Sequence, residues 1–122
     1  MPATVLIADD HLLFAEALEA ILAGDGRVKV VGRAANGEEA VRLDAKLRPD
    51  VILMDISMPV LDGIEATAQI AAKRPEARIL ILTGSDAPAD IDAARRAGAA
   101  GYVTKDRIAA ELVRAILDAA ER

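Results

Sequence analysis

The chain has 122 residues, of which 53% are hydrophobic, and a formal net charge of −5. This length predicts one domain, and the negative charge argues against nucleic-acid binding by its own surface, because contact with phosphates needs a basic patch. The absence of cysteine excludes disulfides and cysteine metal sites. There is no signal-peptide pattern at the start and no apolar run near the roughly 20 residues that span a bilayer. We therefore expect a cytoplasmic domain over residues 1–122 with no membrane partner.

Short apolar runs alternate with segments of helical periodicity along the chain. The first part predicts, in order, a strand at about 3–8, a helix at about 11–23, a strand at about 28–34, a helix at about 38–47, a strand at about 51–55 and a helix at about 64–73. Glycine, asparagine and proline residues between these segments mark their boundaries. The predicted core face of the first helix consists of Phe14, Ala17, Leu18 and Ile21.

The second part predicts a strand at about 78–83, a helix that starts at Ser85-Asp86 with Pro88 and ends at Gly98, a strand at about 101–104 and a helix at about 107–120. The predicted core face of the last helix consists of Ile108, Leu112, Ile116 and Ala119. Three of the apolar runs do not alternate with polar residues, which is typical of central strands covered on both faces. The pattern predicts the α/β class, with a doubly wound parallel sheet of five strands and five flanking helices.

Polar residues stand at the C-terminal ends of four of these strands. Asp9 and Asp10 follow the first strand, and Asp55 ends the third. Thr83 ends the fourth, and Lys105 follows the fifth. Because ligands of open α/β sheets bind beyond the carboxyl ends of the strands, we expect these side chains to meet at one site.

The three aspartates of this set predict a cation. Two carboxylates about 4 Å apart repel each other by about 4 kcal/mol at an effective dielectric constant near 20, so three in one crevice need a compensating positive charge. Oxygen ligands and a shared phosphate favour Mg²⁺. The alternative is that Asp9 and Asp10 only cap the helix that follows them.

Asp55 is the predicted nucleophile, because it ends the central strand. A carboxylate that attacks phosphorus forms an acyl phosphate, and such a transfer depends on positioning and on charge stabilisation. Lys105 and Thr83 would contact the phosphoryl oxygens. Taken singly, Asp55 could be a strand-end cap, Lys105 a surface lysine and Thr83 a strand-forming threonine.

The order and spacing of these residues resemble one protein family over essentially the whole chain. The shared motifs are Asp9-Asp10, Asp55, Met58-Pro59, Asp62-Gly63, Thr83, Tyr102 and Lys105. They resemble the receiver domain of bacterial two-component response regulators. The resemblance implies the strand order 2-1-3-4-5 and phosphorylation of Asp55 by a sensor histidine kinase.

The same resemblance implies the metal ligands and the switch residues. Asp10, Asp55 and the backbone carbonyl of Ser57 would ligate Mg²⁺, with Asp9 acting through a bound water, and Mn²⁺ or Ca²⁺ would substitute for it. Thr83 and Lys105 would respond to the presence of the phosphoryl group. Tyr102 would turn inward on activation, although it could also be an ordinary edge-strand aromatic residue.

The predicted output face lies on the last two helices and the strand between them, and a phosphorylation-dependent homodimer is a further expectation. The candidate residues of the output face are Ile91, Ala94, Arg95, Arg96, Leu112 and Arg114.

Further motifs resemble the NarL/FixJ-type, or LuxR-family, subgroup. These are Ile7-Ala8-Asp9-Asp10-His11 and the segment from Gly101 to Asp106. Such regulators usually carry a C-terminal helix-turn-helix domain that controls transcription, and we expect no output domain within residues 1–122. The domain is either the receiver of a transcription factor or a free-standing receiver. Many receivers have a cis proline after the lysine; Asp106 stands there instead, so we predict a trans peptide.

Four neighbours of the site are assigned smaller roles. His11 is predicted to point past the crevice rather than to bind metal. Gly84 leaves space over the acyl phosphate. The resemblance implies that the positions of Ser57 and Ser85 tune its hydrolysis, and since neither residue is an acid or an amide, hydrolysis should be slow.

Two other classes remain as alternatives. A flavodoxin-like flavin carrier would need a phosphate-binding loop where Asp9-Asp10 stands, and a haloacid-dehalogenase-type phosphatase would need Asp-x-Asp there. The preferred interpretation is a phosphoacceptor that assists its own phosphorylation and dephosphorylation, and not an enzyme that turns over an external substrate.

Overall fold

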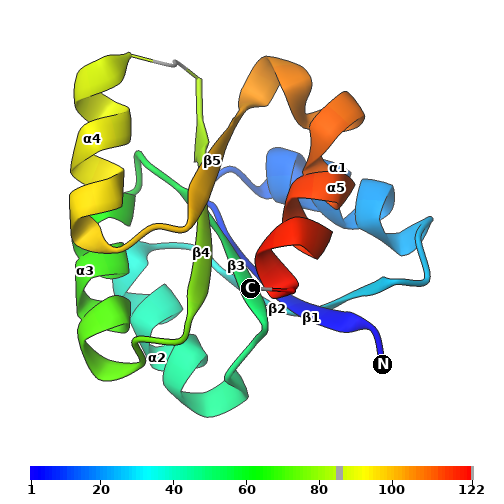
Figure 1. Ribbon diagram of the computed structural model, residues 1–122, viewed down its shortest axis with the longest axis horizontal. Helices are drawn as coiled ribbons and strands as arrows, with labels where there is room; N and C mark the ends of the chain where they lie inside the picture. Colours follow the sequence, from blue (N-terminus) through cyan, green and yellow to red (C-terminus); the bar gives the residue numbers. More distant parts are fainter. Residues whose placement is uncertain (85–86, 122) are drawn as a thin grey trace.

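A computed structural model describes residues 1–84 and 87–121 of the chain. Its centre is a parallel sheet of five strands in the order β2-β1-β3-β4-β5, as Figure 1 shows. The strands are β1 (Ala3–Ala8), β2 (Val28–Ala34), β3 (Val51–Asp55), β4 (Arg78–Thr83) and β5 (Gly101–Thr104). The predicted fold class and strand order are confirmed.

Five α-helices cover the two faces of the sheet. They are α1 (Leu12–Ala23), α2 (Gly37–Leu47), α3 (Gly63–Lys73), α4 (Pro88–Ala97) and α5 (Ile108–Ala120), and a short 3₁₀ helix, η1 (Lys105–Arg107), leads into α5. Helices α1 and α5 lie on one face and α2, α3 and α4 on the other (Figure 1). The molecule is therefore a three-layer sandwich, with its core divided between the two sides of the sheet.

The central strands supply both halves of the core. Along β1, Val5 and Ile7 belong to the cluster under α1 and α5, whereas Leu6 and Ala8 belong to the cluster under α2, α3 and α4. All four residues are fully buried. This burial on both faces explains why the apolar runs in the sequence show no alternation.

The predicted core face of α1 is wrong in part. The buried residues of this helix are Ala15, Leu18 and Leu22, while Ala17 and Ile21 are exposed. Phe14 is partly buried at the edge of the core. Both sets of residues have helical spacing, so the sequence pattern fits either, and the angle at which α1 leaves β1 selects between them.

The core face of α5 is confirmed, because Ile108, Leu112, Ile116 and Ala119 are its buried residues. Helix α4 begins at Pro88, the position where proline is favoured, and ends at Gly98, whose φ is 114°. The predicted start at Ser85-Asp86 lies outside the described residues. No described peptide bond is cis, so the bond between Lys105 and Asp106 is trans, as predicted.

The loop between β3 and α3 is held by two close backbone approaches. The N–H of Gly63 donates to the carbonyl of Ile56 at 3.1 Å, and the N–H of Gly37 donates to the carbonyl of Leu61 at 3.0 Å. A Cβ at Gly63 would collide with the backbone carbonyl of Asp55. Glycine is therefore required at Gly63, where the start of α3 lies against the end of β3.

Among the helices of the described residues, none is both long and apolar enough to cross a membrane.

Candidate functional site

The strand order brings the predicted site residues to one end of the sheet. Asp9 and Asp10 follow β1, Asp55 ends β3, Thr83 ends β4 and Lys105 follows β5. These four strands are consecutive neighbours in the sheet. Residues far apart in the sequence thus meet where their strands end.

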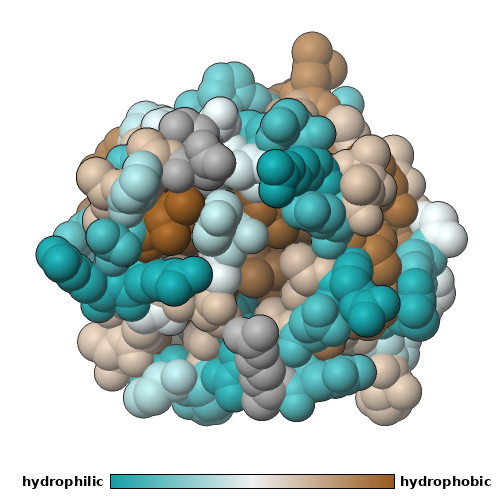
Figure 2. Space-filling model, turned by 45° about the horizontal axis from the view of Figure 1, so that its top comes forward, coloured by the Kyte–Doolittle hydropathy of each residue, from teal (hydrophilic) through white to brown (hydrophobic). Residues whose placement is uncertain are grey.

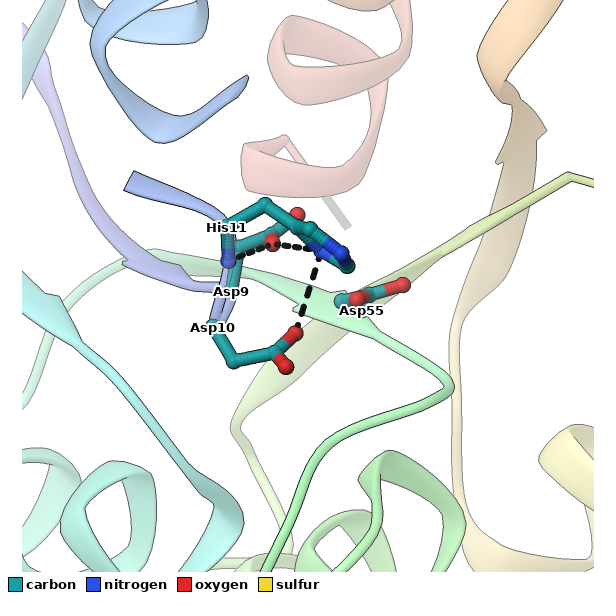
Figure 3. A group of neighbouring side chains, drawn as sticks. All are labelled: Asp9, Asp10, His11 and Asp55. Atoms are coloured by element: carbon teal, nitrogen blue, oxygen red, sulfur yellow. Dashed lines mark hydrogen bonds and ion pairs between the residues drawn. The ribbon is translucent and has the colours of Figure 1, made fainter. Parts of the chain in front are cut away.

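The acids form one compact group. Asp9, Asp10, His11 and Asp55 each offer one ligand atom, and these atoms all lie within 4.8 Å of one another (Figure 3). The side chain of Asp9 is fully buried, that of Asp55 is 2% exposed and that of Asp10 is 29% exposed. The pocket therefore has a buried floor and one acid at its mouth.

Two oxygens of this group are buried without a hydrogen-bond partner among the described residues. They are Oδ2 of Asp9 and Oδ2 of Asp55. A buried carboxylate oxygen normally has a hydrogen-bond or ionic partner, since an unsatisfied one costs about 1–3 kcal/mol or more. Two such oxygens in one acidic pocket fit a hard divalent cation, which prefers oxygen ligands.

The environment of Asp55 favours its neutral form. Burial raises the pKa of this carboxyl above its ordinary value, and the negative charge of Asp9 raises it further. The Lys105 ammonium and the backbone N–H of Ser57 act in the opposite direction without cancelling the effect. A cation in the pocket would favour the ionised form that a nucleophile needs.

Lys105 reaches Asp55 from the segment that follows β5. Its Nζ lies 3.2 Å from Oδ1 of Asp55 and 4.7 Å from the centre of the Phe14 ring. The ring and the carboxylate hold the ammonium in place. Lys105 is thus placed to contact Asp55 or a group bound to it.

Thr83 and Tyr102 share a narrow pocket beneath α4. Thr83 is 3% exposed, and Tyr102, on the edge strand β5, is 37% exposed. The other residues that line this pocket are Ile56, Ile81, Asp90, Ile91 and Ala94. Thr83 and the aromatic residue predicted to move therefore line the same pocket.

The loop residues around Asp55 are arranged in part as expected. Ser57 is exposed, and its backbone N–H is near enough to the Asp55 carboxyl to lower the pKa of that group. The role of its carbonyl as a metal ligand stays a prediction. A Cβ built on Gly84 meets no atom of the described residues within 4 Å, so there is open space at this position, while Ser85 lies outside the described residues.

The predicted direction of His11 is wrong. Its Nδ1 lies 3.3 Å from Oδ1 of Asp9 and 3.2 Å from Oδ1 of Asp10, and Figure 3 shows the ring turned toward the acids. His11 is the residue before α1, where the backbone is still extended, so its side chain does not follow the helical direction. The sequence signal that could have found this is its place directly after two acids at a helix start.

Two of the six candidate output-face residues are also wrong. Ala94 and Leu112 are buried in the two halves of the core. Arg95, Arg96 and Arg114 are exposed, and Ile91 is partly exposed. Figure 2 shows the molecule with the top of Figure 1 turned forward, and hydrophilic and hydrophobic areas are interspersed on this face.

Comparison with known proteins identifies this arrangement. Residues 5–117 match the response regulator receiver domain. The chain belongs to this family. Membership decides against the flavodoxin-like flavin carrier and the haloacid-dehalogenase-type phosphatase.

Similar proteins and structures agree with this assignment. The transcriptional regulatory protein DegU of Brevibacillus brevis is 39% identical over 92% of the chain and 48% of its own length. The nitrate/nitrite response regulator NarL of Escherichia coli K12 is 34% identical over 98% of the chain and 55% of its own length. The chain thus spans about half the length of the curated relatives it matches.

Among solved structures, the signal receiver domain of NarL from Mycobacterium tuberculosis has a TM-score of 0.93 at 38% identity, covering 98% of this chain and 97% of that one. A LuxR-family response regulator from Aurantimonas has a TM-score of 0.94 at 38% identity, covering 99% of this chain and 86% of that one. A complex of CheX, CheY, BeF₃ and Mg²⁺ from Borrelia burgdorferi includes a chain with a TM-score of 0.90 at 26% identity, with coverage of 97% and 89%.

Proposed function

We propose that residues 1–122 form the phosphoacceptor switch of a cytoplasmic two-component system, in which Asp55 accepts a phosphoryl group from a sensor histidine kinase. The observation that carries this proposal is the setting of Asp55. It is buried, one of its oxygens lies 3.2 Å from Lys105, and the other has no partner and faces an acidic pocket.

In the transfer, a lone pair of an Asp55 carboxylate oxygen attacks phosphorus. The bond from phosphorus to the imidazole nitrogen of the kinase phosphohistidine breaks, and its electron pair stays on that nitrogen. Lys105 would then pair with a phosphoryl oxygen. Positioning and charge stabilisation of this kind account for most of the catalysis of phosphoryl transfer.

Mg²⁺, when bound, would neutralise the acids and the charge of the phosphoryl oxygens. Asp10, Asp55 and the carbonyl of Ser57 would hold it, and Asp9 would act through a water. The partnerless oxygens of Asp9 and Asp55 support this assignment, because they leave acceptor capacity that the protein itself does not use.

The phosphorylated state would be relayed through Thr83 and Tyr102. Movement of the Thr83 hydroxyl toward the phosphoryl group would enlarge the narrow pocket under α4, and Tyr102 would enter it. The shared pocket supports this coupling, since both residues line it. The affected surface would be α4, β5 and α5, and a phosphorylation-dependent homodimer would form through it.

The kinase would approach the mouth of the acidic pocket. Leu12 and Leu13 at the start of α1 are 62% and 81% exposed, directly beside Asp10 and His11. Exposed leucines next to a reactive site offer an apolar contact for a protein partner. Because relatives such as DegU are transcriptional regulatory proteins about twice as long, the signal would pass to a DNA-binding domain outside the receiver.

Acetyl phosphate with Mg²⁺ tests the acceptor role by intact mass. The protein should gain the mass of one phosphoryl group, and Asp55→Asn should gain none. Asp62→Asn is the matched control: Asp62 caps α3 in the same loop, and asparagine caps as well as aspartate, so this variant should be labelled normally. A phosphoryl adduct that survives Asp55→Asn would refute the proposal.

A further inference from the structure

His11 contacts the acids of the site, but the proposed phosphoacceptor function gives it no role. Its Nδ1 is 3.3 Å from Asp9 Oδ1 and 3.2 Å from Asp10 Oδ1, and it belongs to the group of ligand atoms that lie within 4.8 Å of one another. In Figure 3 the ring lies between the acids that follow β1 and Asp55. The imidazole is thus placed over the acidic pocket.

Neither helix capping nor burial fixes this placement, and the ring's contacts are those to the two acids. His11 is the N-cap residue of α1, but its side chain makes no capping hydrogen bond. Its backbone N–H donates to Asp9 Oδ1 at 2.8 Å, a contact that any residue except proline could make. The side chain is 67% exposed, so burial does not fix it either.

The spacing of the pocket fits metal coordination that includes a nitrogen ligand. Ligands about 2.1 Å from a tetrahedral ion lie about 3.4 Å from one another. The two distances from His11 Nδ1 to the acids, 3.3 and 3.2 Å, are close to this value. The partnerless, buried Oδ2 atoms of Asp9 and Asp55 are a second and independent sign that the pocket holds a cation.

A nitrogen ligand changes which ions the pocket prefers. Carboxylates and carbonyls suit Mg²⁺, whereas imidazole suits Zn²⁺ and Ni²⁺. These two ions also bind nitrogen and oxygen sites more tightly than Mg²⁺ in general. We propose that His11 is a ligand that lets this pocket bind divalent transition-metal ions of the Zn²⁺ and Ni²⁺ class, in competition with Mg²⁺. The inference rests on the proposed Mg²⁺ pocket and adds a ligand to it.

Metal titration of the chain without an affinity tag tests the proposal, with Zn²⁺, Ni²⁺ and Mg²⁺ chlorides as the probes. His11→Phe keeps a ring of similar size and removes both nitrogens. Loss of an outer-shell partner of a metal ligand costs roughly tenfold in affinity, so loss of a ligand should weaken Zn²⁺ and Ni²⁺ binding by at least this factor. The Kd for Mg²⁺ should stay unchanged. His11→Asn should behave in the same way, and thermal unfolding of both variants shows whether the exposed position has altered the fold.

Nitrogen NMR gives a direct readout without any activity measurement. Because the chain has one histidine, one imidazole contributes ring signals. Zn²⁺ should shift the Nδ1 resonance strongly, whereas Mg²⁺ should leave it close to its metal-free position. Excess Mg²⁺ should reverse the Zn²⁺ shift if the two ions share the pocket.

The outcomes separate this inference from the proposed function. If Zn²⁺ leaves the ring signals unchanged, or if His11→Phe lowers the affinities for Mg²⁺ and Zn²⁺ by the same factor, His11 is a hydrogen-bond partner of the acids and the inference is wrong. The Mg²⁺ pocket survives both results. A protein that binds neither Mg²⁺ nor Zn²⁺ would overturn the pocket and the inference together.

Discussion

Asp55 is a buried carboxyl group, and the cost of its buried charge makes the stability of the protein depend on pH. In the folded protein its pKa is raised, first by burial and then by Asp9. Between the ordinary pKa of an aspartate and this raised value, the folded protein binds more protons than the unfolded chain. The free energy of unfolding therefore falls as the pH rises through this range.

We predict that Asp55→Asn raises the free energy of unfolding at neutral pH in buffer without divalent ions, because it removes the cost of a buried charge. The gain should shrink as the pH falls to the ordinary range of an aspartate. Urea unfolding of both proteins over a pH series measures the difference. A gain that is the same at every pH would contradict the assigned cause, and Asp62→Asn, an exposed cap, should show no such trend.

Val60 adopts a backbone conformation that its side chain disfavours. Its φ is 69°, and the N–H of Leu61 donates to the carbonyl of Pro59 at 2.7 Å, which makes a γ-turn with Val60 at its centre. A β-branched residue at positive φ is strained, and this type of γ-turn is rare. The strain lies in the loop between the phosphoacceptor strand and α3.

We expect Val60→Gly to raise the free energy of unfolding by about 0.5–1 kcal/mol, since glycine adopts this conformation without strain. Val60 is 75% exposed, so little packing is lost. Val60→Asn should also stabilise the protein, and Val60→Ala, which keeps a Cβ, should gain less. Thermal or urea unfolding ranks the three variants, and a loss of stability in Val60→Gly would show that the turn is not strained.

At the scale of elements, a buried ion pair joins α2 to the end of α3. Arg74 Nη2 lies 2.6 Å from Oδ1 of Asp44 and donates to the carbonyl of Pro49 at 2.9 Å. The two side chains are 11% and 5% exposed. The pair joins the C-terminal ends of α2 and α3. It lies at the opposite end of the sheet from the acidic pocket.

Removing one partner should be costly, because it leaves the other charge buried and unpaired. We predict that Arg74→Met lowers the free energy of unfolding by about 3–5 kcal/mol. The double variant Asp44→Leu with Arg74→Met should recover most of this loss. Urea unfolding of the two single variants and the double variant gives the coupling energy; an Arg74→Met variant of normal stability would mean that the pair contributes nothing.

At the scale of the whole molecule, two helical layers enclose the sheet (Figure 1), and Asp10, at the mouth of the acidic pocket, is 29% exposed. Water therefore reaches the pocket, and the lifetime of an acyl phosphate depends on whether a side chain orients that water for attack. Ser57 is exposed and is neither an acid nor an amide. No strong water-orienting group stands at that position.

We accordingly expect slow hydrolysis, with the phosphorylated protein persisting well beyond seconds. Release of phosphate after removal of the donor measures the rate. Ser57→Asn, which adds an amide able to orient water, should shorten the lifetime, whereas Asp62→Asn should not. Complete decay of the unsubstituted protein within seconds would contradict the expectation.

Much of the fold and of the site is visible in the sequence, because both depend on local patterns. Uninterrupted apolar runs mark the central strands, and glycine and proline mark the ends of the helices. Since consecutive β-α units form parallel strands, polar residues at the ends of those runs had to meet, as Asp9, Asp10 and Asp55 do. The core face of α5 also follows from its sequence, since its apolar residues form a single stripe.

Where the sequence pattern fits more than one side-chain orientation, the tertiary structure selects one of them. The sequence of α1 allows more than one apolar face, and packing against the sheet selects Ala15, Leu18 and Leu22. Burial of Ala94 likewise depends on how α4 lies against the strands. The turn of the His11 ring toward the acids depends on an extended backbone just before a helix, which no periodicity records. Sequence patterns determine which elements form and in what order, whereas the orientation of each side chain is set by contacts between residues far apart in the chain.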